Sequence, residues 1–265
     1  MIGSIRMIVA LFCVAVATLV LVPFQLLAMK TGWYREGLVR GLWHKVNVKA
    51  MGFRVHLNGT MTTKRPLLIA SNHISWTDIE IMASLFDISF IAKSELAGWP
   101  LIGKLSRLQR PIYVERDRKR KSGEQASELA TRLAANEPMV LFAEGSTADG
   151  NMLLPFKSTL FGAASKVIAE GIADTIYIQP VAIAYTRIHG MPMGRQHRVL
   201  GSWIGDQDLV PHIAELLREG AIDVELHFGE PLEFSSGASR KTLARQVERR
   251  VHDMMQDALR NPRPS

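Results

Sequence analysis

The chain has 265 residues, of which 47% are hydrophobic and 22% charged, and this length suits one large domain or two small ones. The formal net charge of +7 favours anionic partners such as phospholipid headgroups, acidic carrier proteins or nucleic acid. A single cysteine, Cys13, excludes an internal disulfide and a multi-cysteine zinc site.

The N-terminal segment predicts a membrane helix. Residues 7–29 form a run of 23 residues without charge, and about 20 such residues cross the hydrocarbon core as a helix. A cleaved signal peptide is the weaker alternative, because the run is long and no small-x-small site follows it. Pro23 should kink or end the helix near Val22, which leaves either a short span or a hairpin in one leaflet. Excess Lys and Arg after the run predict that the rest of the chain lies in the cytoplasm.

The next segment, residues 38–52, predicts an amphipathic helix, because apolar residues recur there mostly three or four positions apart. Interleaved Arg and Lys suit a helix that lies on anionic lipid, and the same pattern suits a helix packed on the domain. We therefore assign residues 1–52 to a membrane anchor with an interfacial helix, and residues 53–265 to a further domain.

This further domain alternates short strands and helices, which is the signature of an α/β layer architecture. The predicted strands, which are short apolar runs bounded by polar or turn residues, are 53–57, 66–70, 88–92, 111–114, 139–143 and 175–185. The predicted helices are 79–86, 124–135, 160–170 and 241–259.

The first buried strand of this domain leads into a candidate catalytic pair, His73 and Asp78. His73 falls in the turn after the strand, and Asp78 falls in the first turns of the next helix, where its carboxylate can fold back onto the imidazole. Asp78 would then fix the tautomer of His73 and stabilise the imidazolium, which leaves the other ring nitrogen to take a proton from a hydroxyl. The alternative is an ordinary histidine beside an ordinary helix-start carboxylate.

Other patterns in the chain carry weaker signals. Residues 98–104 nearly match a phosphate-binding loop, but Leu105 stands where the magnesium-binding hydroxyl is needed, so we predict no nucleotide site. Residues 104–121 hold eight basic and two acidic residues without a nucleic-acid-binding module, which favours attraction to anionic lipid or an acidic acyl carrier. No metal site is predicted, because no ligand spacing appears among His189, His197, Asp206 and Asp208.

Four blocks of the chain, in order, resemble the glycerolipid acyltransferase family, which includes the lysophosphatidic acid acyltransferases. Asn72-His73 followed by Asp78 resembles the family's N-H-x-x-x-x-D block. Residues 112–116 (Ile-Tyr-Val-Glu-Arg) are similar to its apolar-then-Arg block, and residues 142–147 (Phe-Ala-Glu-Gly-Ser-Thr) to its F-P-E-G-T-R block. Residues 179–183 are similar to its apolar Pro-Val strand. A further stretch that begins at Lys93 resembles its K-x-E-L segment.

The resemblance implies a mixed sheet flanked by helices, an acyltransferase domain over residues 53–265, and acyl transfer to a lysolipid hydroxyl. The acyl donor would be a thioester of acyl carrier protein or coenzyme A, with no cofactor and no metal. His73 and Asp78 would be catalytic. No covalent acyl-enzyme is expected, because the chain lacks a G-x-S-x-G nucleophile elbow. The residues that the resemblance implies for substrate binding are Asn72, Lys93, Arg116, Glu144, Gly145 and Lys157.

One departure from the family pattern bears on the acceptor. Ser146-Thr147 stands where lysophosphatidic acid acyltransferases have Thr-Arg, and that Arg is associated with the acceptor phosphate. Its loss weakens the case for a glycerol phosphate acceptor unless Arg116 or Lys157 compensates for it. Residues 144–164 and 185–198 look closer to a bacterial branch that acylates lyso-ornithine lipid, which has no phosphate.

We therefore expect a lyso-ornithine lipid O-acyltransferase on the bacterial inner membrane, surrounded by membrane lipids, with its catalytic domain on the cytoplasmic side. A lysophosphatidic acid acyltransferase is the first alternative. The second is a membrane-tethered protein, without enzymatic activity, that binds lipid or nucleic acid.

Overall fold

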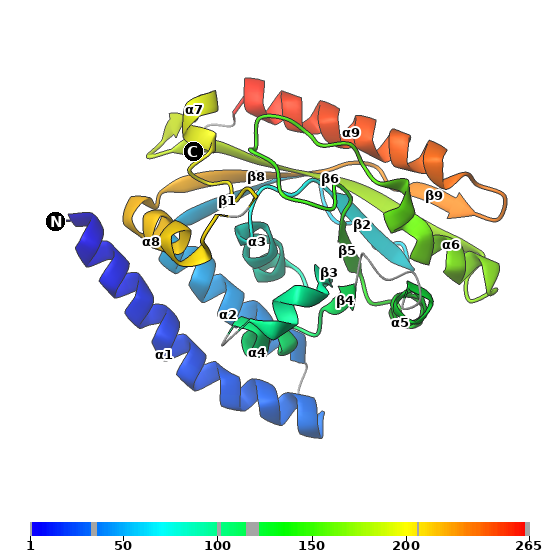
Figure 1. Cartoon of the computed structure of the whole chain (residues 1–265), viewed down its shortest axis with the longest axis horizontal. Helices are drawn as coiled ribbons and strands as arrows, with labels where there is room; N and C mark the ends of the chain where they lie inside the picture. Colours follow the sequence, from blue (N-terminus) through cyan, green and yellow to red (C-terminus); the bar gives the residue numbers. More distant parts are fainter. Residues whose placement is uncertain (1, 33–35, 100–101, 115–121, 206, 263–265) are drawn as a thin grey trace.

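A computed structural model describes residues 2–32, 36–99, 102–114, 122–205 and 207–262. Its centre is a nine-stranded sheet in which the main path runs β1-β8-β6-β2-β5-β3-β4, while β7 and β9 pair with β6 (Figure 1). The strands are β1 (Phe53–Asn58), β2 (Leu67–Ser71), β3 (Ser89–Lys93), β4 (Ile112–Val114), β5 (Met139–Phe142), β6 (Thr175–Ile188), β7 (Met191–Pro192), β8 (Ile222–Phe228) and β9 (Leu232–Ser235).

The sheet is mixed. β2 pairs in parallel with β5 and β6, β3 pairs in parallel with β4 and β5, and β1 pairs in parallel with β8. β6 runs antiparallel to β7, β8 and β9. Every residue of β2 and β5 is buried, as expected for short apolar strands of a sheet covered on both faces.

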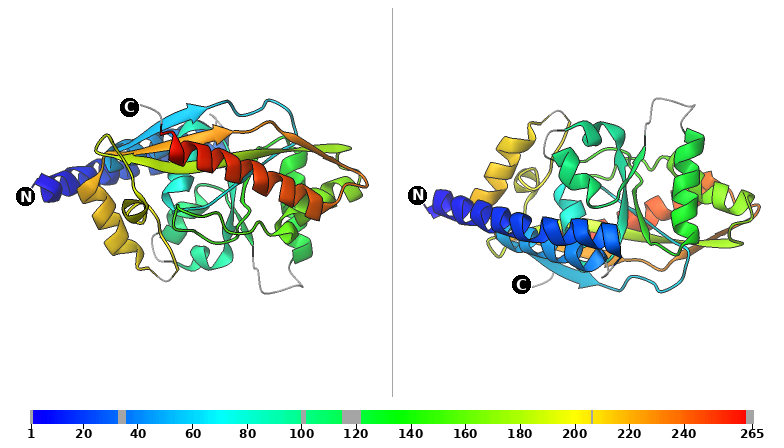
Figure 2. Two further views of the ribbon diagram at one scale, coloured as in Figure 1. Left: turned by 90° about the horizontal axis from the view of Figure 1, so that it is seen from above. Right: turned by 90° about the horizontal axis from the view of Figure 1, so that it is seen from below.

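Helices cover both faces of the sheet, with α9 along one face and α1 and α2 along the other (Figure 2). Their bounds are α1 (Ile2–Thr31), α2 (Glu36–Met51), α3 (Thr77–Leu85), α4 (Ile102–Arg107), α5 (Ser122–Ala134), α6 (Gly162–Ala169), α7 (Arg195–Arg198), α8 (Leu209–Glu219) and α9 (Arg240–Arg260), with 3-10 turns at Ser94–Gly98 and Ser158–Phe161. Alternate residues of β2 enter two apolar cores. Leu67 and Ile69 pack on the side of α2, α3 and α8, while Leu68 and Ala70 pack on the side of α5, α6 and α9.

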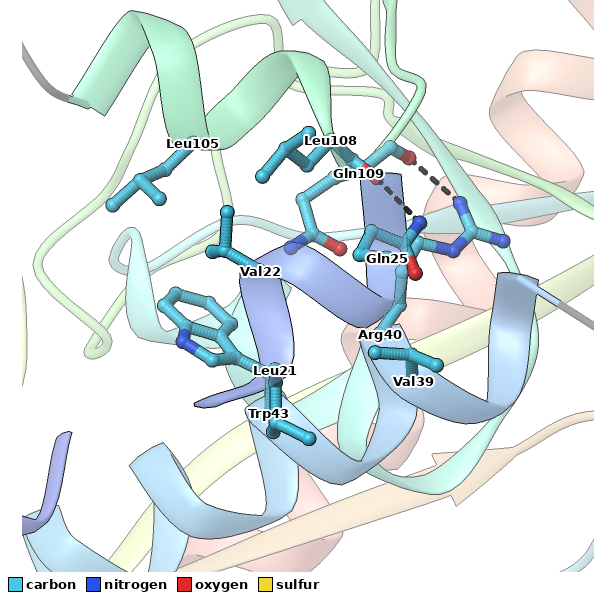
Figure 3. A pocket seen from close by; sticks show the side chains of 9 residues that line it. All are labelled: Leu21, Val22, Gln25, Val39, Arg40, Trp43, Leu105, Leu108 and Gln109. Carbon is cyan, nitrogen blue, oxygen red and sulfur yellow. Dashed lines mark hydrogen bonds between the residues drawn. The ribbon is translucent and has the colours of Figure 1, made fainter. Parts of the chain in front are cut away.

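The apolar helix α1 is held along the body of the domain. Near its start, the Arg6 guanidinium donates to the carbonyl oxygens of Leu217 and of Met51, the latter at 2.7 Å. Near its end, the Gln25 side chain donates to the carbonyl oxygen of Leu108 at 3.2 Å, at the floor of an apolar pocket between α1, α2 and α4 (Figure 3). The helix continues through Pro23 to Thr31, so of the two outcomes expected at Pro23, a kink or an end near Val22, the structure excludes the end.

The outer face of α1 is apolar and exposed. Its exposed large side chains include Ile5, Ile8, Phe12, Leu19 and Phe24. Among the described helices, α1 alone has the length and apolar composition that crossing a membrane requires. The helix α2 packs on the domain, as one of the two alternatives predicted, with His44 and Val48 buried, while Leu38 and Leu42 are 67% and 51% exposed.

Candidate active site

His73 and Asp78 meet at the carboxyl end of β2. Nδ1 of His73 lies 2.8 Å from Oδ2 of Asp78, which is fully buried, while the His73 side chain keeps 17% of its surface exposed. The imidazole stacks on the Phe142 ring at the end of β5, with ring centroids 3.8 Å apart and planes 9° apart. The predicted contact between the two side chains is confirmed, and Phe142 fixes the plane of the imidazole.

The carboxylate of Asp78 is satisfied on both oxygens. Oδ2 accepts hydrogen bonds from the backbone N–H of Ile74 at 2.7 Å and of Ser75 at 2.9 Å, and Oδ1 accepts one from the Tyr185 hydroxyl at 2.8 Å. Since a carboxylate only accepts, Nδ1 of His73 must be the donor in their contact. The partners therefore assign the proton to Nδ1, which leaves Nε2 as the basic nitrogen.

Glu144 supports the loop that carries His73. Oε1 accepts a hydrogen bond from the backbone N–H of His73 at 2.9 Å, and Oε2 accepts one from the backbone N–H of Leu154 at 3.0 Å. The side chain lies inside the fold, with the residue only 2% exposed. Burial raises the pKa of Glu144 to about 8, against the lowering effect of these two backbone donors. This geometry shows that Glu144 holds the backbone of the His73 loop, and it gives no support to the expected contact with the acceptor.

Gly145 forms the bend after Glu144, with φ of +72°, a conformation that favours glycine. A Cβ on Gly145 would lie 3.1 Å from Nζ of Lys157, so the exposed Lys157 ammonium closely covers this turn. Among the residues predicted to bind substrate, these two lie together, with Gly145 buried and Lys157 exposed.

Asn72 is placed differently from the prediction. It is 1% exposed, its amide nitrogen donates to the carbonyl oxygen of Ile183 at 2.9 Å, and its amide oxygen accepts from the Ile183 N–H at 2.8 Å. These bonds join the end of β2 to β6, so the geometry gives no support to a substrate contact. Lys93 ends β3, but its side chain, like the whole of Arg116, lies outside the described residues.

Sequence reasoning missed Tyr185 and Phe142 as parts of this site. Both occupy positions in predicted strands, where a Tyr or Phe is ordinarily a core residue. The pairing of β2 between β5 and β6 brings them to His73 and Asp78, and no local pattern in the chain reveals that strand order. The assembled site offers a partly exposed imidazole, oriented by a buried carboxylate and free at Nε2 to take a proton from a hydroxyl.

Comparison with known proteins agrees with this chemistry. The family model described as Acyltransferase matches residues 52–184. The chain is 48% identical to the lyso-ornithine lipid O-acyltransferase of Brucella abortus, over 98% of this chain and 97% of that protein. It is 42% identical to the enzyme of the same name from Rhizobium meliloti, over 98% and 89% of the two chains.

A shorter similarity extends to another acceptor class. The chain is 34% identical to the 1-acyl-sn-glycerol-3-phosphate acyltransferase of Neisseria gonorrhoeae, over 40% of this chain and 42% of that protein. The crystal structure of the 1-acyl-sn-glycerophosphate acyltransferase PlsC from Thermotoga maritima superposes over the full length of both chains, with a TM-score of 0.67 and 19% identity. This likeness confirms the predicted fold, a mixed sheet flanked by helices with an apolar N-terminal helix.

Proposed function

This chain belongs to the acyltransferase family, and we propose that it transfers a fatty acyl chain from a thioester to the hydroxyl of lyso-ornithine lipid, which gives ornithine lipid. The observation that carries the chemistry is the contact between Nδ1 of His73 and Asp78, because it leaves Nε2 as a base. The acceptor is supported by the similarity over nearly the whole chain to two enzymes named for it. The absence of a cation at Ser146-Thr147 agrees with an acceptor without phosphate.

In the proposed reaction, Nε2 of His73 takes the proton of the acceptor hydroxyl as the hydroxyl oxygen attacks the thioester carbonyl. The tetrahedral oxyanion then collapses, the carbon–sulfur bond breaks, and the departing thiolate takes a proton from the imidazolium. Asp78 stabilises the imidazolium between these two steps. General-base assistance of this kind accelerates reactions by about a hundredfold to ten-thousandfold.

We further propose that acyl carrier protein or acyl-CoA is the donor, and that the protein lies on the bacterial inner membrane with its catalytic domain in the cytoplasm. The net charge of +7 suits an acidic carrier and anionic lipid. Contacts at Arg6 and Gln25 tie both ends of α1 to the domain, while its outer apolar face is open. This arrangement favours a helix that lies in one leaflet among membrane lipids over one that crosses the bilayer.

The remaining candidate acceptor is lysophosphatidic acid, which the shorter similarity to the Neisseria gonorrhoeae enzyme favours. Membership of an enzyme family sets aside the alternative of a tethered lipid- or nucleic-acid-binding protein.

The test is an acyl transfer assay with the full chain in detergent micelles, one acyl carrier protein thioester, and each acceptor in turn. We expect ornithine lipid to form with a kcat/KM at least about tenfold above that for lysophosphatidic acid. Preference for lysophosphatidic acid would overturn the proposed acceptor.

A further inference from the structure

Two loops converge on the segment that carries the catalytic histidine. The carbonyl oxygen of His73 accepts a hydrogen bond from the backbone N–H of Ala148 at 2.8 Å. The carbonyl oxygen of the next residue, Ile74, accepts one from the backbone N–H of Trp203 at 3.0 Å. The loop after β5 and the loop after α7 are therefore both tied to the His73 backbone.

Arg198 lies where these two loops meet. A Cβ on Gly150 would lie 3.5 Å from Cγ2 of Ile74 and 3.8 Å from Cβ of Arg198. Gly150 therefore lies between Arg198 and the segment that carries His73. Gly150 has φ of +74°, which favours glycine at this position. The fold thus brings Cβ of Arg198, from a distant part of the chain, next to Gly150, which packs against Ile74, the residue after His73.

Among the described residues, the Arg198 guanidinium has one hydrogen-bond partner. Its Nη1 donates to Oδ1 of Asn151 at 2.9 Å, and the Asn151 side chain is itself fixed by Oδ2 of Asp149 and by the carbonyl oxygen of Arg195, each at 3.2 Å. Within the described part of the chain, the buried Nε of Arg198 has no hydrogen-bond partner. Burial and the Arg195 charge lower the pKa of Arg198, while Asp149 raises it. A guanidinium nevertheless stays charged at neutral pH.

A partly buried cation with unused donors is costly unless an anion completes it. A guanidinium presents its N–H groups as a planar fork that matches a carboxylate, and Asn151 already fixes one edge of that fork. Two further cations near this loop, Lys157 and Arg195, are exposed, and an exposed cation is well solvated without a ligand.

We propose that Arg198 binds the carboxylate of the acceptor headgroup and so selects an amino-acid lipid. This inference rests on the proposed function, because the ornithine of lyso-ornithine lipid carries a free carboxylate whereas its hydroxyl is on the attached acyl chain. The competing explanation is that Arg198 only cross-links two loops through Asn151. A cross-link would lower kcat or stability without recognising any group of the acceptor.

The test compares lyso-ornithine lipid with its headgroup carboxamide analogue, on the full chain and on two variants, Arg198→Gln and Arg195→Gln. Arg195 is the matched control, since it is exposed on the same short helix and contacts Asn151 only through its backbone carbonyl. We expect the wild type to show a KM about tenfold or more higher for the carboxamide. Arg198→Gln should raise the KM for lyso-ornithine lipid by a similar factor, lose the preference for the carboxylate, and keep the donor KM. Arg195→Gln removes the neighbouring charge that lowers the pKa of Arg198 and should keep the wild-type preference for the carboxylate over the carboxamide.

Equal wild-type KM values for the two acceptors would overturn the inference, and this result does not depend on whether a variant folds. An Arg198→Gln enzyme that still prefers the carboxylate would also overturn it. So would an Arg198→Gln enzyme in which the KM for the donor rises and the KM for the acceptor does not, because that result would assign the guanidinium to a phosphate of the thioester. A wild type that acylates lysophosphatidic acid but not lyso-ornithine lipid would refute the proposed function itself.

Discussion

The hydroxyl of Tyr185 donates a hydrogen bond to Oδ1 of Asp78 over 2.8 Å, although 107 residues separate the two in the chain. Burial raises the pKa of the Tyr185 phenol well above its ordinary value, and the charge of Asp78 adds to this effect, so the hydroxyl remains a donor. The Asp78 carboxylate is therefore oriented by a strand of the central sheet as well as by its own loop.

Tyr185→Phe removes this donor and leaves the ring in place. Because one hydrogen bond to a buried charged group contributes about 1.5–3 kcal/mol, we expect kcat to fall about tenfold with little change in KM. Tyr177→Phe on the same strand is the control and should keep wild-type kcat, since its ring faces Lys64. Steady-state kinetics would contradict this role for Tyr185 if both variants behaved alike.

Glu144→Gln tests the buried carboxyl that holds the His73 backbone. A pKa raised from 4.5 to about 8 means that the folded state keeps a proton which the unfolded state loses, so stability falls as pH rises through this window. Glutamine cannot titrate, and its NH2 group cannot accept from a backbone N–H. We expect the wild type to be the more stable at pH 5 and its advantage in Tm to shrink by about 5 °C at pH 8.5. A difference in Tm between the wild type and Glu144→Gln that does not change with pH would refute the raised pKa of Glu144.

His44→Gln tests a polar link between α2 and α3. His44 contacts Glu80 through Nδ1 at 2.7 Å and the side-chain oxygen of Gln109 through Nε2 at 2.8 Å. Burial lowers the pKa of His44, but the Glu80 carboxylate and these two hydrogen bonds together raise it above 6.5. The stabilisation is therefore complete below pH 6.5 and lost as pH rises through the folded pKa. The loss of Tm in His44→Gln should be larger at pH 6 than at pH 9, and the opposite order would exclude an imidazolium here.

Arg6→Ala tests how α1 is attached. The guanidinium binds carbonyl oxygens near the C-terminal ends of α2 and α8, where a cation is favourable, and it packs against Gly52 and Gly220. We expect a loss of about 1–2 kcal/mol in attachment and faster backbone amide exchange in the first turns of α1 in micelles. Lys30→Ala, at the exposed far end of α1, should exchange there at the wild-type rate. Equal exchange rates in the two variants would show that Arg6 does not hold the helix.

Local patterns were enough to predict the helices and strands that build the site. The His73 and Asp78 contact followed from a turn between a buried strand and a helix. The strand β8 was not predicted, although Asp223, Glu225 and His227 alternate with its apolar residues as in a half-buried strand, and the structure buries all three. They pair within the sheet, as His56 does with Asp223 at 2.7 Å, and such pairing depends on which strands are neighbours.

The supporting residues of the site could not be predicted for the same reason. Tyr185 and Phe142 reach the His73 segment through strand order, which depends on contacts between distant parts of the chain. For Glu144, the sequence indicated the position in the chain but not the direction in which the side chain points. Its place at the end of β5 suggested an exposed ligand for substrate, while the structure turns it inward onto two backbone N–H groups.

The most direct test of the central claim is the rate of acyl transfer by His73→Gln, with His56→Gln as its matched control. His56 also contacts a buried aspartate, at 2.7 Å, but lies on β1 outside the site. If Nε2 of His73 is the general base, His73→Gln should lower kcat/KM by about a thousandfold while its Tm stays close to that of the wild type. His56→Gln should remain within about twofold of the wild-type rate. A His73→Gln enzyme that keeps more than about a tenth of wild-type kcat/KM would contradict the account.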